Sequence, residues 1–110
     1  MVSQMPPDPQ STFKALADPT RRDILALLGS RDMSIGDVAS HFDMTRPAVK
    51  KHLAVLAQGQ LITVTPKGRE RINAINPDGF RAMESWLSTF DRFWDDRLAA
   101  LKSAVEKDAP

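Results

Sequence analysis

The sequence lacks cysteine and tyrosine entirely, and its 110 residues contain no long hydrophobic run. Without cysteine, disulfides and thiolate metal sites are excluded. No apolar stretch approaches the roughly 20 residues that a membrane-spanning helix requires. The first ten residues also lack the cationic and apolar regions of a secretory signal. We therefore expect a cytoplasmic protein that makes no contact with a membrane.

Groupings typical of enzymes are also missing. The sequence has no recognisable pairing of a nucleophile with a base, and it has no glycine-rich phosphate loop. We expect no enzymatic activity, no catalytic residue and no cofactor.

The residues that are present have the composition of a globular protein, with 42% hydrophobic and 26% charged residues. A chain of this length forms one domain around one core. The net charge is only +1, but it is unevenly distributed: residues 1–43 and 72–110 each sum to −2, whereas residues 44–71 sum to +5. A basic segment between acidic ones indicates a nucleic-acid-binding surface on a nearly neutral domain.

Helix-capping residues predict four helices in the first half of the chain. A tail over residues 1–10 precedes a short helix over 11–17, and the next three helices have Asp18, Ser34 and Thr45 as their N-caps. After residue 59, apolar and polar residues alternate on either side of the turn sequence "PKGR", which predicts a β-hairpin. We expect one face of this hairpin to hold Ile62, Val64, Ile72 and Ala74.

The last part of the chain predicts one long helix over residues 78–106, because its apolar residues recur at three- and four-residue steps. The predicted fold is mainly α with a small β-hairpin, namely a winged helix-turn-helix of about five helices with a two-stranded wing. The single domain spans 11–106, with the helix-turn-helix over 34–57 and the wing over 61–76.

The segment "TRPAVKKHLAVL" at residues 45–56 predicts the DNA-recognition helix. Ala48, Val49, Leu53 and Leu56 fall on one side, as a core-facing stripe requires, and the cationic side chains fall away from it. In a helix-turn-helix, the first residues of the second helix meet base edges in the major groove. The candidate DNA-binding residues here are Thr45, Arg46, Lys50, Lys51 and His52. The alternative is an ordinary solvated basic face.

Lys67, Arg69 and Arg71 surround the predicted hairpin turn and are further candidates for DNA binding. A cationic hairpin tip beside a recognition helix can reach the DNA backbone or the minor groove. Arg21 and Arg22 are open to two interpretations: they contact phosphate, or they are surface residues that pair with neighbouring carboxylates.

Three segments resemble the ArsR/SmtB-type family of winged-helix repressors: "FKALADPTRRDILALL", "MTRPAVKKHLAVLAQGQLI" and "PKGRERINAINP". The last helix, with "MESWLSTFDRFWDDRL", resembles that of a non-metal subset of the family. The resemblance implies a homodimeric repressor that binds operator DNA and often regulates its own operon. It also raises the question of a small-molecule inducer, which the sequence does not identify. Because the third predicted helix has no cysteine and the last has no histidine, we expect no bound metal.

The last predicted helix has more apolar surface than a monomer of this size can cover, which favours a dimer. The resemblance adds packing of the first helix against the partner's last helix. Candidate interface residues are Phe13, Leu16, Trp86, Phe90, Phe93, Trp94 and Leu101. In a two-fold dimer the recognition helices would lie about 34 Å apart, which predicts a palindromic double-stranded operator. The alternative function is a protein-interaction module that uses this aromatic helix.

Overall fold

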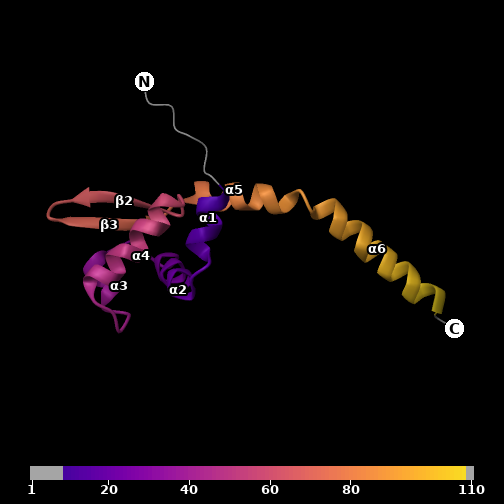
Figure 1. The fold of residues 1–110 in the computed structure, drawn as a ribbon, viewed down its shortest axis with the longest axis horizontal. Coiled ribbons are helices and arrows are strands. Elements are labelled where there is room, and N and C mark those ends of the chain that lie inside the picture. The colour runs from indigo at the N-terminus through magenta and orange to yellow at the C-terminus, as the bar shows by residue number, and fades with distance from the viewer. Residues whose placement is uncertain (1–8, 109–110) are drawn as a thin grey trace, which may run out of the picture.

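The computed structural model describes residues 9–108 as six helices and a small antiparallel sheet (Figure 1). The elements follow in the order α1 (Pro9–Leu16), α2 (Pro19–Leu28), β1 (Met33–Ser34), α3 (Ile35–Ala39), α4 (Arg46–Gln58), β2 (Ile62–Lys67), β3 (Glu70–Ile75), α5 (Pro77–Ser88) and α6 (Asp91–Asp108). The β2–β3 hairpin and α6 project at opposite ends of a chain that measures 69 × 41 × 20 Å. Within residues 9–108, every helix is too short or too polar to cross a membrane.

The predicted helix caps are confirmed. The side chains of Asp18, Ser34 and Thr45 each accept a hydrogen bond from a backbone N–H three residues later, at 3.0, 3.1 and 3.3 Å. Each bond satisfies an N–H that has no partner within its own helix, so it fixes where α2, α3 and α4 begin. The winged helix-turn-helix predicted from the sequence is therefore the fold observed.

The hydrophobic core lies between α1–α4 and the sheet. Ile24, Val38 and Val49 are completely buried, one each from α2, α3 and α4, and Leu61 closes the core at the start of the hairpin. The predicted stripe of α4 is confirmed at Val49, Leu53 and Leu56, which are buried, while Ala48 at its start is half-buried. This packing holds α4 with its cationic face outward.

The wing differs from the prediction in having a third strand. The two-residue β1 pairs antiparallel with β3, so the strand order is β1-β3-β2. Asn73 of β3 is buried, and its side-chain amide donates to the Met33 carbonyl oxygen at 3.1 Å. This bond ties the wing to the residues that lead into α3.

The predicted face of the hairpin is wrong in part. Ile62 and Val64 share one face. Ile72 and Ala74 pair with Thr65 and Thr63 and therefore lie on the opposite face. The cause is the length of the turn. Lys67 pairs with Glu70 across a two-residue loop, so each odd-numbered residue of one strand lies opposite an even-numbered residue of the other. Residues with even numbers on both strands, such as Val64 and Ile72, therefore point to opposite faces. Gly68 occupies the first loop position at φ 63°, a conformation that glycine adopts without strain.

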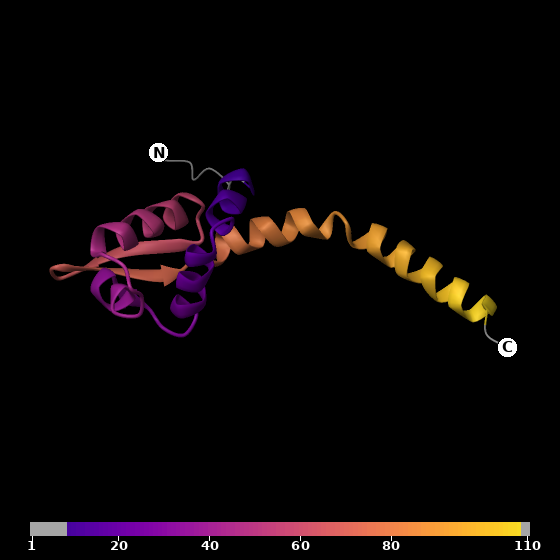
Figure 2. The ribbon, with the colours of Figure 1, turned by 60° about the horizontal axis from the view of Figure 1, so that its bottom comes forward.

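The helix boundaries near the two ends also differ from the prediction. The first helix begins at Pro9, so residues 9 and 10 are helical and not part of the predicted tail; the rest of that tail lies outside the described residues. The single helix predicted over 78–106 is instead two helices that meet at an angle (Figure 2). At the break, the hydroxyls of Ser88 and Thr89 donate to backbone carbonyl oxygens three residues earlier, at 2.8 and 2.7 Å. Such bonds compete with the helical pattern.

Candidate nucleic-acid interface

A cationic groove lies where the start of α4 meets α3 and the wing. Its volume is about 580 Å³. Four cations line it, Arg46 and Lys50 from α4 and Arg69 and Arg71 from the wing, with Glu70 as the one acidic lining residue. Residues about 20 positions apart in the sequence therefore form one concave positive surface.

The first turn of α4 positions Arg46. Thr45 caps the helix and Pro47 lies within its first turn, where the fixed φ of proline suits a helix and the missing N–H costs no hydrogen bond. The Arg46 guanidinium lies over Gly36 of α3, since a Cβ added to Gly36 would stand 2.8 Å from Arg46 Nη2. Gly36 was not predicted as a site residue, because only the fold brings α3 beneath this side chain.

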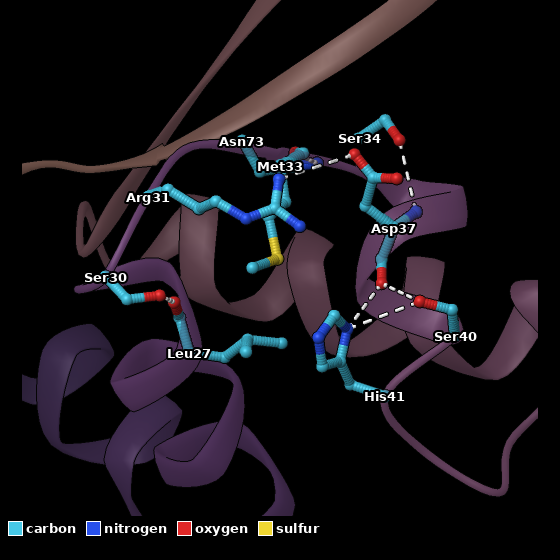
Figure 3. Close-up of polar contacts among 9 residues, drawn as sticks. All are labelled: Leu27, Ser30, Arg31, Met33, Ser34, Asp37, Ser40, His41 and Asn73. Atoms are coloured by element: carbon cyan, nitrogen blue, oxygen red, sulfur yellow. Dashed lines mark hydrogen bonds and ion pairs between the residues drawn. The ribbon is translucent and has the colours of Figure 1, made fainter.

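Helix α3 and the residues that follow it are held by local polar contacts around Asp37 (Figure 3). The Asp37 carbonyl oxygen accepts from Ser40 Oγ at 2.6 Å and lies 2.8 Å from His41 Nδ1, which makes that nitrogen a donor. The Asp37 carboxylate lies 4.0 Å from Arg31 Nη1, an exposed ion pair of small energetic value. His41 is thus engaged with the backbone of its own helix.

The remaining predicted DNA-binding residues lie outside the groove lining. Lys51 is exposed on α4. Lys67 is also exposed and stands opposite Glu70 in the register of the β2 and β3 strands. His52 points toward the start of α2, with its Nδ1 3.5 Å from Arg21 Nη1 and 3.9 Å from Asp18 Oδ2. This contact joins α4 to the N-terminus of α2.

Asp18 has a lowered pKa. The largest cause is the hydrogen bond from the backbone N–H of Arg21 to its carboxylate. Burial acts in the opposite direction, and the electrostatic interaction with the Arg21 guanidinium lowers the pKa further. The carboxylate is therefore ionised at neutral pH, and its negative charge stabilises the N-terminus of α2, where the helix dipole is positive.

Arg21 and Arg22 cap the end of α1. Arg21 donates from Nε to the Ala15 carbonyl oxygen at 2.7 Å and from Nη2 to that of Lys14 at 3.0 Å, and Arg22 donates from Nη1 to that of Leu16 at 2.6 Å. Carbonyl groups in the last turn of a helix have no partner within that helix. The Lys14 carbonyl oxygen also accepts from the Ala17 N–H at 3.2 Å, so the arginines complete the cap. This arrangement could not be predicted from local pattern, because the partners are backbone atoms of another helix.

The predicted interface residues fall into two groups: some contact other residues of their own chain, and the others lie on α6 and are about half exposed or more. Phe13 and Trp86 meet edge to face within one chain, with ring centroids 5.3 Å apart, and Phe90 continues the stack at 5.0 Å. Leu16 packs against the core of its own chain. In contrast, the exposed fractions of Phe93, Trp94 and Leu101 are 49%, 59% and 63%.

Within residues 9–108, metal-binding side chains do not gather at one place. Across the part of the chain that the structure describes, no three His, Cys, Asp or Glu residues are placed where they could hold a metal ion together.

Comparison with known proteins identifies the family. A family model described as a helix-turn-helix domain matches residues 16–65. The transcriptional repressor SdpR of Bacillus subtilis is 36% identical over 88 residues, which cover 80% of this chain and 98% of the relative. A crystal structure of the ArsR family transcriptional regulator RHA00566 is 36% identical, with a TM-score of 0.72, over 78% of this chain and 94% of that one. The chain belongs to the ArsR family.

A more distant structure shares the ArsR fold. It is the homodimeric winged helix-turn-helix DNA-binding domain Mb0332 of Mycobacterium bovis, a possible ArsR-family regulator. Its identity is 23% and its TM-score 0.63, over 83% of this chain and 91% of that one. At this identity, the likeness concerns the fold.

Proposed function

We propose that this ArsR-family chain is a homodimeric transcriptional repressor that acts in the cytoplasm and binds a palindromic operator through α4 and the wing. The observation that supports it most directly is the cationic groove, in which Arg46 and Lys50 of α4 converge with Arg69 and Arg71 of the wing. Phosphate neutralisation by such cations supplies most of the affinity of a protein for DNA.

The two elements that form the groove have different roles in this proposal. Arg46 and Lys50 stand near the N-terminus of α4, which enters the major groove in a helix-turn-helix, and both can donate to guanine O6 and N7. Arg69 and Arg71 reach the backbone beside it. Thr45, Lys51 and Lys67 contact flanking phosphates, while His52 supports α4 through its contact with the N-terminus of α2.

The dimer is supported by the apolar surface that one chain leaves exposed. Trp86, Phe90, Phe93 and Trp94 are each 40–59% exposed. Burial of an aromatic side chain of this size contributes roughly 1.5–3 kcal/mol, so a second copy that covers them would be strongly favoured. A two-fold dimer presents two α4 helices to successive turns of one DNA face.

The test is a salt series of binding to the DNA upstream of the protein's own gene, beside a scrambled duplex. We expect preference for the upstream DNA and a slope of log affinity against log salt of about −0.9 per phosphate neutralised. Equal and weak binding to both duplexes would contradict a specific operator there. A flat salt slope, or no binding at low salt, would instead favour a protein-interaction module.

Substitutions separate the two roles. Arg46→Ala and Lys50→Ala should each reduce the discrimination between operator and scrambled DNA by about 1–3 kcal/mol. Arg69→Ala should weaken binding to both duplexes about equally. Arg81→Ala removes an exposed cation of α5 that pairs with Asp78, and it is the matched control that should leave both affinities unchanged. Parental binding by all three groove variants would show that the interface lies elsewhere.

A further inference from the structure

The cationic groove is concave, and a concave surface can enclose a small ligand. Helix α4 and the β2–β3 hairpin lie side by side in both views (Figures 1 and 2), and the groove of about 580 Å³ lies where they meet α3. We propose that this groove also binds a small polyphosphate anion, and that the bound anion displaces operator DNA. This inference rests on the proposed function, because it assigns a regulatory ligand to the same site.

The four cations of the groove are available to a ligand. They are exposed side chains of α4 and the wing, namely Arg46, Lys50, Arg69 and Arg71. Within residues 9–108, none of the four takes part in an ion pair or donates a side-chain hydrogen bond. By contrast, Arg21 and Arg22 donate to backbone carbonyl oxygens of their own chain. The groove therefore gathers charged donors that the fold itself does not use.

The charge of the groove indicates the charge of the ligand. Four cations and the single carboxylate of Glu70 leave a net charge of +3 on the lining. In a polyphosphate, each phosphate carries at least one negative charge, and its terminal oxygens accept hydrogen bonds. Arginine offers such oxygens a planar fork of donors, and lysine offers a compact positive charge. A chain of about three phosphates therefore matches the lining in charge and in hydrogen bonding.

A buried hydroxyl adds a neutral donor to this site. Ser34 is one of the lining residues and is only 7% exposed. Its Oγ accepts from the Asp37 N–H at 3.1 Å, and the described part of the chain holds no acceptor for the hydroxyl proton. A serine hydroxyl can accept and donate at the same time. Its proton is thus available to a phosphate oxygen in the groove.

The groove has room for such a ligand. Its volume falls in the range of roughly 300–1,000 Å³ that is typical of small-molecule sites. Ile35 and Pro47 also line it, so the base of a nucleotide would find an apolar surface beside the cations. A duplex presents phosphates that are fixed along its strands, whereas a flexible polyphosphate chain can fold into one concavity. The same donors can therefore serve DNA and a compact anion in turn.

Occupancy by the anion excludes DNA from the same side chains. Arg46 and Lys50 cannot donate to guanine while they hold phosphate, so the two ligands compete. For competition at one site, the apparent Kd for operator rises by the ratio of free anion to its own Kd, plus one. An anion at about ten times its Kd should therefore weaken operator binding by about tenfold.

A competition experiment with labelled operator tests the displacement. Tripolyphosphate and ATP are the probes, added without divalent cations while potassium chloride keeps the ionic strength constant. We expect both to release the operator, measured by fluorescence anisotropy. Equal potency would assign recognition to the phosphates, and a stronger effect of ATP would add the Ile35–Pro47 surface. Release that depends only on ionic strength would overturn the proposal.

Calorimetry without DNA locates the site. We expect one tripolyphosphate per chain, and Lys50→Ala and Arg71→Ala should each weaken its binding by roughly tenfold. The matched control is Lys51→Ala, which removes an exposed cation of the same helix outside the groove lining and should keep the parental affinity for tripolyphosphate. The urea midpoint verifies that each variant is folded. An equal loss in Lys50→Ala and Lys51→Ala would show a response to overall charge and overturn the site.

The outcomes separate this inference from the proposed function. If the parent protein prefers operator DNA but tripolyphosphate displaces it no better than chloride of equal ionic strength, the anion site is wrong and the repressor remains. If tripolyphosphate binds once per chain but the protein prefers no duplex, the anion site remains and the proposed operator binding fails.

Discussion

Gly79 gives the sharpest prediction about stability. It is a buried residue in the first turn of α5, and its N–H donates to the Gln60 carbonyl oxygen at 3.0 Å. A Cβ at this position would overlap that same oxygen and would come within 2.9 Å of the Gly59 carbonyl oxygen. Both obstacles are backbone atoms, and Gln60 already has a positive φ of 58°, so the turn cannot easily yield.

The expected cost of Gly79→Ala follows from two opposing effects. Overpacking against backbone costs about 1–3 kcal/mol. Alanine regains at most about 1 kcal/mol through its better helix propensity. The overlap should prevail, so we expect a net loss of about 1–2 kcal/mol and a fall in Tm of roughly 5–10 °C.

The assay is urea unfolding followed by circular dichroism at a fixed protein concentration, because association changes apparent stability. We expect a lower midpoint with an unchanged slope. The control is Ser85→Ala, at an exposed position of the same helix, which should leave stability equal or slightly raised. If Gly79→Ala were as stable as the parent, the close contact between α5 and the turn after α4 would be refuted.

Three other predictions concern single side chains. Thr45→Ala should cost about 1 kcal/mol in urea unfolding, because α4 loses its N-cap, whereas Thr45→Ser should be nearly neutral. Gly36→Ala forces the Arg46 guanidinium to move, so operator affinity measured by fluorescence anisotropy should fall several-fold while the urea midpoint is kept; unchanged affinity would contradict the role of Arg46. Because the pKa of Asp18 is lowered in the folded protein, its carboxylate contributes stability above its ordinary pKa of 3.8, and this is lost as the pH falls further. Asp18→Asn keeps a capping side chain that does not titrate, so its free energy of unfolding should decrease less with falling pH than that of the parent. An unchanged dependence on pH would argue against this linkage.

Local pattern was sufficient to predict the helices of the winged helix-turn-helix. Asp18, Ser34 and Thr45 each cap a helix through a bond that spans three residues, so the information lies within a few positions of the sequence. The burial of Val49 and Leu53 follows from helical spacing in the same way. Such features need no knowledge of the rest of the fold.

Features that depend on tertiary contacts could not be predicted this way. The two-residue β1 has no sequence pattern of its own, and it exists because β3 pairs with it and Asn73 bonds to Met33. Arg21 caps α1 from α2, a role that the order of residues does not reveal. For the candidate site, the cations of α4 and the wing were predicted, but the position of Gly36 beneath Arg46 was not.

The exposure of α6 has a consequence for the lifetime of the protein in a cell. A helix of 18 residues is only marginally stable in water unless something packs on it, and α6 has no buried residue in its own chain. In the proposed homodimer, a second copy would cover part of the helix, whereas in a dilute monomer the helix would fray and be open to proteases. Degradation would then be fastest when the regulator is scarce, so that its abundance would control its own turnover.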